Sequence, residues 1–119
     1  MAHELSPPVV VIETRRIVDW ESFHDEFASA FGFPGFYGRN MNAWIDCMTS
    51  LDDTGAGMSK IHCAPGSVVT LAVEDVQDFA RRCPEQYAAL IECAAFVNWR
   101  RIEQGQGSVL ALSFNNPGK

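Results

Sequence analysis

The chain has 119 residues, of which 47% are apolar and 20% charged, and its formal net charge is −6. This size and composition fit one globular domain, which we place at residues 1–119, and they exclude a disordered chain. No apolar run reaches the roughly 20 residues needed to cross a bilayer. Because no basic cluster followed by an apolar stretch opens the sequence, we expect no signal peptide, and hence a cytoplasmic protein without a membrane partner.

The negative charge is concentrated between positions 19 and 53. This window holds seven acidic residues and a single basic one, Arg39. Nucleic-acid binding needs clustered Lys and Arg side chains, so we expect no nucleic-acid partner. A basic protein is the natural complement of an acidic face. The alternative is that the acidic residues only keep the domain soluble.

The cysteines are too widely spaced to form a metal-binding motif; they are Cys47, Cys63, Cys83 and Cys93. The His62-Cys63 pair could bind zinc together with Cys83, Cys93 or His24. Scattered single cysteines are more often reduced, buried and apolar in role. We therefore expect neither a metal nor a cofactor.

The first half of the chain reads as one strand and two helices. Residues 8–13 form an apolar, β-branched run that suits a strand buried on both faces. Asp19 caps an amphipathic helix that ends at Gly32. Proline and glycine make residues 33–38 an aromatic loop. A second helix follows from Asn40 to about residue 51.

The second half repeats this order after a turn-rich loop at residues 52–66. A strand is expected at 67–73, a short helix after Glu74 and Asp75, a long helix from Pro84 to Gln104, and a strand at 108–114. Residues 1–7 and 115–119 are expected to be frayed. The order β-α-α-β-α-α-β predicts an α/β domain, a small parallel sheet packed with about four helices.

Catalytic motifs are absent from the sequence. The turns after the first two strands lack the glycines that let backbone amides approach a phosphate, and neither GxGxxG nor GxxxxGK[ST] occurs. No local context supports a nucleophilic cysteine beside His24 or His62. We expect that the protein is not an enzyme.

The helix from Asn40 carries two separate stripes when its residues are laid out at about 100° each. One stripe is apolar and suits a core: Met41, Trp44, Met48 and Leu51. The other is a candidate partner-binding face: Asn42, Ile45, Asp46 and Thr49. The aliphatic side chain of Ile45 and the carboxylate of Asp46, beside the aromatic loop, could form an interface hot spot. Alternatively, Ile45 widens the core stripe, Asp46 is merely solvated, and the loop aromatics pack inward.

Residues 33–48, Phe-Pro-Gly-Phe-Tyr-Gly-Arg-Asn-Met-Asn-Ala-Trp-Ile-Asp-Cys-Met, closely resemble the signature of the barstar family of intracellular ribonuclease inhibitors. In that family, a loop of the form Leu/Phe-Pro-x-aromatic-Tyr/Phe-Gly-x-Asn leads into a helix carrying Asp/Asn-Ala-x-x-Asp-Cys-Leu/Met. The resemblance implies a three-stranded parallel sheet covered by helices. It also implies a 1:1 inhibitor, monomeric when free, that protects its cell from a ribonuclease toxin.

The resemblance also assigns roles to individual residues. In the family, this loop and helix plug the active site of a basic ribonuclease. Asp46 matches the aspartate that stands in for the substrate phosphate, Phe36 matches the aromatic that covers the active site, and Thr49 matches a contact near the helix end. With Asn42 and Ile45 these residues form the expected partner-binding site.

Several positions depart from the family pattern. Asn42 replaces an acidic residue one turn before Asp46, and Ile45 occupies the position of an exposed tryptophan. Arg100 and Arg101 stand where a further glutamate would fall. The loop at 52–66 is also longer than in the type member. A second hypothesis therefore remains: an immunity or regulatory protein of the same fold, directed through this loop at a non-ribonuclease toxin or another protein.

Overall fold

A computed structural model describes residues 7–117. Its regular elements, in chain order, are β1 (Val9–Ile12), the 3-10 turn η1 (Thr14–Arg16), α1 (Trp20–Phe31), α2 (Met41–Thr49), the 3-10 turn η2 (Thr54–Ala56), β2 (Val69–Val73), α3 (Val76–Arg82), α4 (Pro84–Glu103) and β3 (Leu110–Phe114). The expected β-α-α-β-α-α-β order is confirmed. Within the described residues, no helix combines the length and the apolar character needed to cross a membrane.

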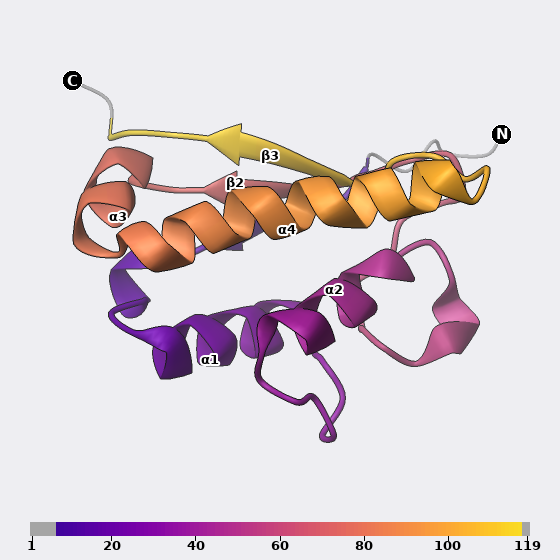
Figure 1. Cartoon of the computed structure of the whole chain (residues 1–119), viewed down its shortest axis with the longest axis horizontal. Helices are drawn as coiled ribbons and strands as arrows, with labels where there is room; N and C mark the ends of the chain where they lie inside the picture. The colour runs from indigo at the N-terminus through magenta and orange to yellow at the C-terminus, as the bar shows by residue number, and fades with distance from the viewer. Residues whose placement is uncertain (1–6, 118–119) are drawn as a thin grey trace, which may run out of the picture.

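The three strands form one parallel sheet in the order β1-β2-β3, as expected. Val9 pairs with Thr70, and Val69 pairs with Leu110. Figure 1 shows α4 lying in front of the sheet, with α1 and α2 below it. In this view α4 passes in front of part of the sheet, β3 stays visible above α4, and α2 packs against α4 from below.

The expectation that the first strand is buried on both faces is wrong. Val10 and Ile12 are buried, whereas Val9 and Val11 are exposed. β1 is an edge strand, and alternate side chains of a strand point to opposite faces. β-Branched residues favour strand geometry even where they stay exposed, so the apolar run indicated the strand but not its burial.

α1 begins and ends as its sequence predicts. The backbone N–H of Ser22 donates to Asp19 Oδ1 at 2.9 Å, and the Ser22 hydroxyl accepts from the Asp19 N–H, which completes a capping box. Gly32 ends the helix with φ +67°. A Cβ there would lie 2.8 Å from the Lys60 side chain, so the close packing of Lys60 also requires glycine.

The core fills the space between the sheet and the helices with large side chains. Phe23, Phe27 and Phe31 of α1 are fully buried, and the ring of Phe27 meets that of Trp44 edge-on at 5.6 Å. α2 also packs against α4. α2 is therefore held from two sides, and its outward face is fixed by this packing.

The described part of the C-terminal segment is tied to the fold rather than frayed. The Asn115 N–H donates to the Val73 carbonyl at 3.0 Å, and the Gln77 N–H donates to Asn116 Oδ1 at 3.1 Å. These bonds extend the sheet and hold the start of α3. The frayed ends expected at 1–6 and 118–119 lie outside the described residues.

Candidate protein-binding site

The loop between α1 and α2 is held by Tyr37, whose side chain turns inward. Its hydroxyl lies 2.5 Å from His24 Nδ1, and its ring packs 4.7 Å from that of Phe33. Burial raises the pKa of Tyr37, so the hydroxyl stays protonated. Burial lowers the pKa of His24, and the nearby Arg39 lowers it further. One side of the loop is thus fixed to α1 by an uncharged contact.

Arg39 and Asn40 fix the other side of the loop. Arg39 adopts φ +57° and donates from Nη2 to Asp25 Oδ1 at 2.8 Å and to the Glu21 carbonyl at 3.1 Å. Asn40 caps α2, as predicted, because its side chain accepts the Ala43 N–H at 2.8 Å. The start of α2 is therefore fixed relative to α1.

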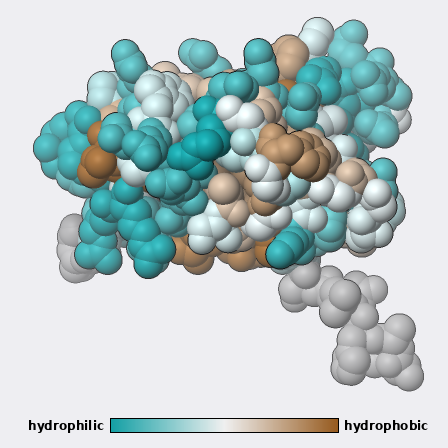
Figure 2. All heavy atoms as spheres, turned by 90° about the horizontal axis from the view of Figure 1, so that it is seen from below, coloured by the Kyte–Doolittle hydropathy of each residue, from teal (hydrophilic) through white to brown (hydrophobic). Residues whose placement is uncertain are grey.

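Between these two anchors, Phe36 projects into solvent and is 75% exposed. Of the neighbouring aromatics Phe36 and Tyr37, Tyr37 packs inward and Phe36 does not, so the alternative in which both pack inward describes Tyr37 only. Figure 2 views the molecule from the side of α1, α2 and this loop, and shows a largely hydrophilic surface with separate hydrophobic areas. A single exposed phenylalanine on an anchored loop is available as an aromatic contact.

Along α2, the expected binding stripe is only partly exposed. Asn42 is exposed, Asp46 is 61% exposed, and Thr49 is half-buried. The Thr49 hydroxyl donates to the Ile45 carbonyl at 2.6 Å. The carboxylate of Asp46 faces outward, where another molecule can reach it.

Ile45 is placed differently from the other members of the stripe. It is 8% exposed and belongs to the hydrophobic core. Because α2 packs against both α1 and α4, its apolar arc is wider than the four-residue stripe read from the sequence. The alternative in which Ile45 widens the core describes this residue correctly, and Ile45 offers little surface to a partner.

A cation stands beside the exposed carboxylate. Arg100 Nη2 of α4 lies 3.8 Å from Asp46 Oδ1. Sequence reasoning noted Arg100 only as a departure from the family pattern and missed this pairing. The signal was weak, since 54 positions separate the two residues and only the packing of α4 on α2 brings them together.

On the inner side of α2, Cys47 is buried. Burial, together with the neighbouring Asp46 charge, raises the pKa of the Cys47 thiol to about 11. The thiol is therefore neutral at physiological pH and behaves as a small apolar side chain. Across residues 7–117, the structure brings together no group of three His, Cys, Asp or Glu side chains suited to a metal ion.

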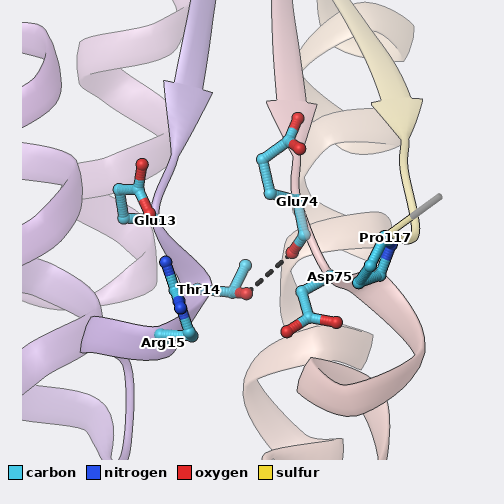
Figure 3. Close-up of a pocket in the computed structure, with 6 residues that line it drawn as sticks. All are labelled: Glu13, Thr14, Arg15, Glu74, Asp75 and Pro117. Atoms are coloured by element: carbon cyan, nitrogen blue, oxygen red, sulfur yellow. Dashed lines mark hydrogen bonds between the residues drawn. The ribbon is translucent and has the colours of Figure 1, made fainter.

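A cavity of about 360 Å³ lies elsewhere, at the carboxyl ends of β1 and β2 (Figure 3). Its lining is Glu13, Thr14, Arg15, Glu74, Asp75 and Pro117. The Thr14 hydroxyl donates its hydrogen to the Glu74 carbonyl at 2.7 Å, so it has no hydrogen left to donate to a phosphate. Carboxyl ends of parallel strands often bind phosphates, but three carboxylates around this cavity oppose an anion.

These features define a class of protein. A parallel α/β domain presents an exposed aromatic on an anchored loop and an exposed carboxylate on a packed helix, away from the cavity, and such side chains are available to a protein partner. The family described as "Barstar (barnase inhibitor)" matches residues 8–112, and the chain belongs to this family. Members of the family are inhibitors rather than enzymes.

One curated relative gives a shorter match. The chain is 36% identical over 44 residues to the Bacillus subtilis (strain 168) protein named "Putative ribonuclease inhibitor YrdF". The match covers 37% of this chain and 48% of that protein, so the chain spans about half of its length.

Proposed function

We propose that this protein inhibits a basic ribonuclease by binding its active site, with Asp46 occupying the place of a substrate phosphate. The observation that carries the proposal is the outward, 61% exposed carboxylate of Asp46 on a helix that packs on two sides. Membership of the Barstar family and the name of the partial relative support it.

The chemistry of a nuclease cleft explains why a carboxylate can serve this purpose. Such a cleft positions Arg, Lys or His side chains around the phosphate of RNA. A carboxylate accepts two parallel hydrogen bonds from a guanidinium, as a phosphate does. Because Asp46 is held on a packed helix, little conformational entropy is lost when it binds. Phe36, on the anchored loop, would cover the neighbouring base-binding surface.

The test is inhibition of a basic ribonuclease, with barnase as the first probe, in a 1:1 titration of RNA cleavage. Asp46→Asn should weaken inhibition at least 100-fold, since charge-assisted bonds in a buried cleft are lost. Glu85→Gln is the matched control, because Glu85 is an exposed acid in the first turn of α4. Equal inhibition by Asp46→Asn and the wild type would contradict the role of Asp46.

The second candidate is a different toxin or regulatory partner, bound through residues 52–66. The segment 53–57 favours it, since its residues are exposed and lie between anchored ends of the loop. The anchoring is firm: Ser59 Oγ donates to the Phe31 carbonyl at 3.0 Å, and the Cys63 N–H donates to the Leu51 carbonyl at 3.0 Å. Replacing residues 54–57 by a shorter turn tests this candidate: the change should abolish binding of such a partner, and unchanged partner binding would contradict it.

A further inference from the structure

Arg100 lies beside the Asp46 carboxylate. Its Nη2 atom lies 3.8 Å from Asp46 Oδ1, and its guanidinium lies 5.9 Å from the centre of the Phe96 ring, one turn earlier on α4. The packing of α4 against α2 fixes the distance between the two backbones. The positive charge of Arg100 therefore lies beside Asp46, the carboxylate that we propose enters the nuclease cleft.

The ion pair between Arg100 and Asp46 is easily broken, so other cations can replace Arg100 at the carboxylate. A separation of 3.8 Å is longer than a hydrogen bond, and the side chains of Arg100 and Asp46 are 37% and 61% exposed. Exposed pairs of this kind contribute little stability. Cations of a cleft that approach Asp46 to hydrogen-bond distance would therefore displace Arg100.

Displacement leaves Arg100 inside the interface. A stable complex covers roughly 800 Å² on each partner, so a group 3.8 Å from the central carboxylate cannot lie outside it. The cations of the cleft would then repel the guanidinium, and like charges across an interface suppress binding. A carboxylate from the partner removes this repulsion, and the planar guanidinium can bind it through two hydrogen bonds.

We infer that Arg100 is a specificity-determining residue: it selects basic nucleases that carry an aspartate or glutamate beside the cations that receive Asp46. The inference rests on the proposed function of Asp46 and names its partner more closely. Carboxylates are ordinary members of nuclease clefts, since general acid–base catalysis uses them. A nuclease that presents only cations to Arg100 would be excluded as a partner.

The experiment measures binding by calorimetry, with barnase as the probe. The barnase surface position that faces residue 100, when Asp46 occupies the cleft, is made glutamate in one version and lysine in another. The wild-type protein should bind the glutamate version at least tenfold more tightly. Arg100→Glu should reverse this order. Arg15→Glu is the control, because it changes the net charge equally at an exposed site in η1 and should keep the wild-type order.

Three outcomes separate the inference from the proposed function. Equal wild-type affinity for both probes, or an unreversed order in Arg100→Glu, overturns the role of Arg100. Asp46→Asn should weaken binding to both probes and preserve their order. Unchanged binding by Asp46→Asn would overturn the proposed function and, with it, the inference that rests on it, and so would the absence of binding in every combination.

Discussion

Arg101 and Asp52 form a buried ion pair that ties the segment after α2 to α4. Arg101 Nη2 donates to Asp52 Oδ2 at 2.7 Å, and Nη1 donates to Oδ1 at 3.1 Å. Arg101 is 5% exposed and also donates to the carbonyls of Thr49 at 2.8 Å and Gly107 at 2.7 Å. One guanidinium thus joins the end of α2 to the segment that enters β3.

This arrangement predicts a large effect on stability. Arg101→Met should lower the free energy of unfolding by about 3–5 kcal/mol, because it leaves the Asp52 carboxylate and two carbonyls without their donors. Arg100→Met, one position earlier and more exposed, should change it by no more than about 1 kcal/mol. Urea unfolding followed by circular dichroism compares the two. A similar loss in both variants would show that Arg101 is not the main contact.

The sequence could predict the elements because their signals are local. The Asp19 cap, the Gly32 stop and Pro84 at the first position of α4 depend on neighbours within a few residues, and each was placed correctly. The parallel sheet followed from strands separated by helices. The resemblance located the loop and α2 for the same reason, since its motif is contiguous.

Burial and charge pairing could not be predicted in the same way. Ile45 is buried where α2 packs against α1 and α4, and Val9 is exposed because it points to the face of the sheet opposite that of the buried Val10 and Ile12. Neither fact is encoded in the periodicity of its own segment. The pairing of Arg100 with Asp46 likewise depends on the packing of two helices far apart in sequence. Which residues form the candidate binding surface could therefore be determined only from the structure.

His24 should make stability depend on pH. Its pKa in the folded protein lies below the ordinary value of 6.5, chiefly through burial and then through Arg39, while Asp25 opposes the shift. The folded state thus disfavours the protonated ring. The contribution of the neutral His24 ring to stability is complete above pH 6.5, and it is lost as the pH falls through the lowered pKa that His24 has in the folded state. Unfolding should therefore require less urea at pH 5.5 than at pH 7.5.

The comparison that isolates this effect uses His24→Gln, which cannot titrate in this range but can still bond to the Tyr37 hydroxyl. Its loss of stability between pH 7.5 and pH 5.5 should be smaller than that of the wild type. An identical loss in both proteins would assign the pH dependence to other groups.

The cysteines should differ in reactivity. The thiol of Cys93 is half-buried, whereas Cys47, Cys63 and Cys83 are buried. Burial raises the pKa of Cys47 to about 11, and only the thiolate is an effective nucleophile. Iodoacetamide at pH 7.5 should therefore label Cys93 first in the native protein, and all four thiols in urea. Mass spectrometry of the peptides identifies the sites, and early labelling of Cys47 would show that α2 opens readily.

Phe36 should matter for binding and not for folding. Its side chain is 75% exposed, so Phe36→Ala removes few internal contacts and should change the free energy of unfolding by less than about 0.5 kcal/mol. If the loop covers a ribonuclease cleft as proposed, the same change should weaken inhibition by at least tenfold, because a central aromatic contact is lost. Phe114→Ala removes another exposed aromatic, on β3, and should leave inhibition unchanged. Parallel titrations of RNA cleavage measure both variants, and equal inhibition by them would remove Phe36 from the interface.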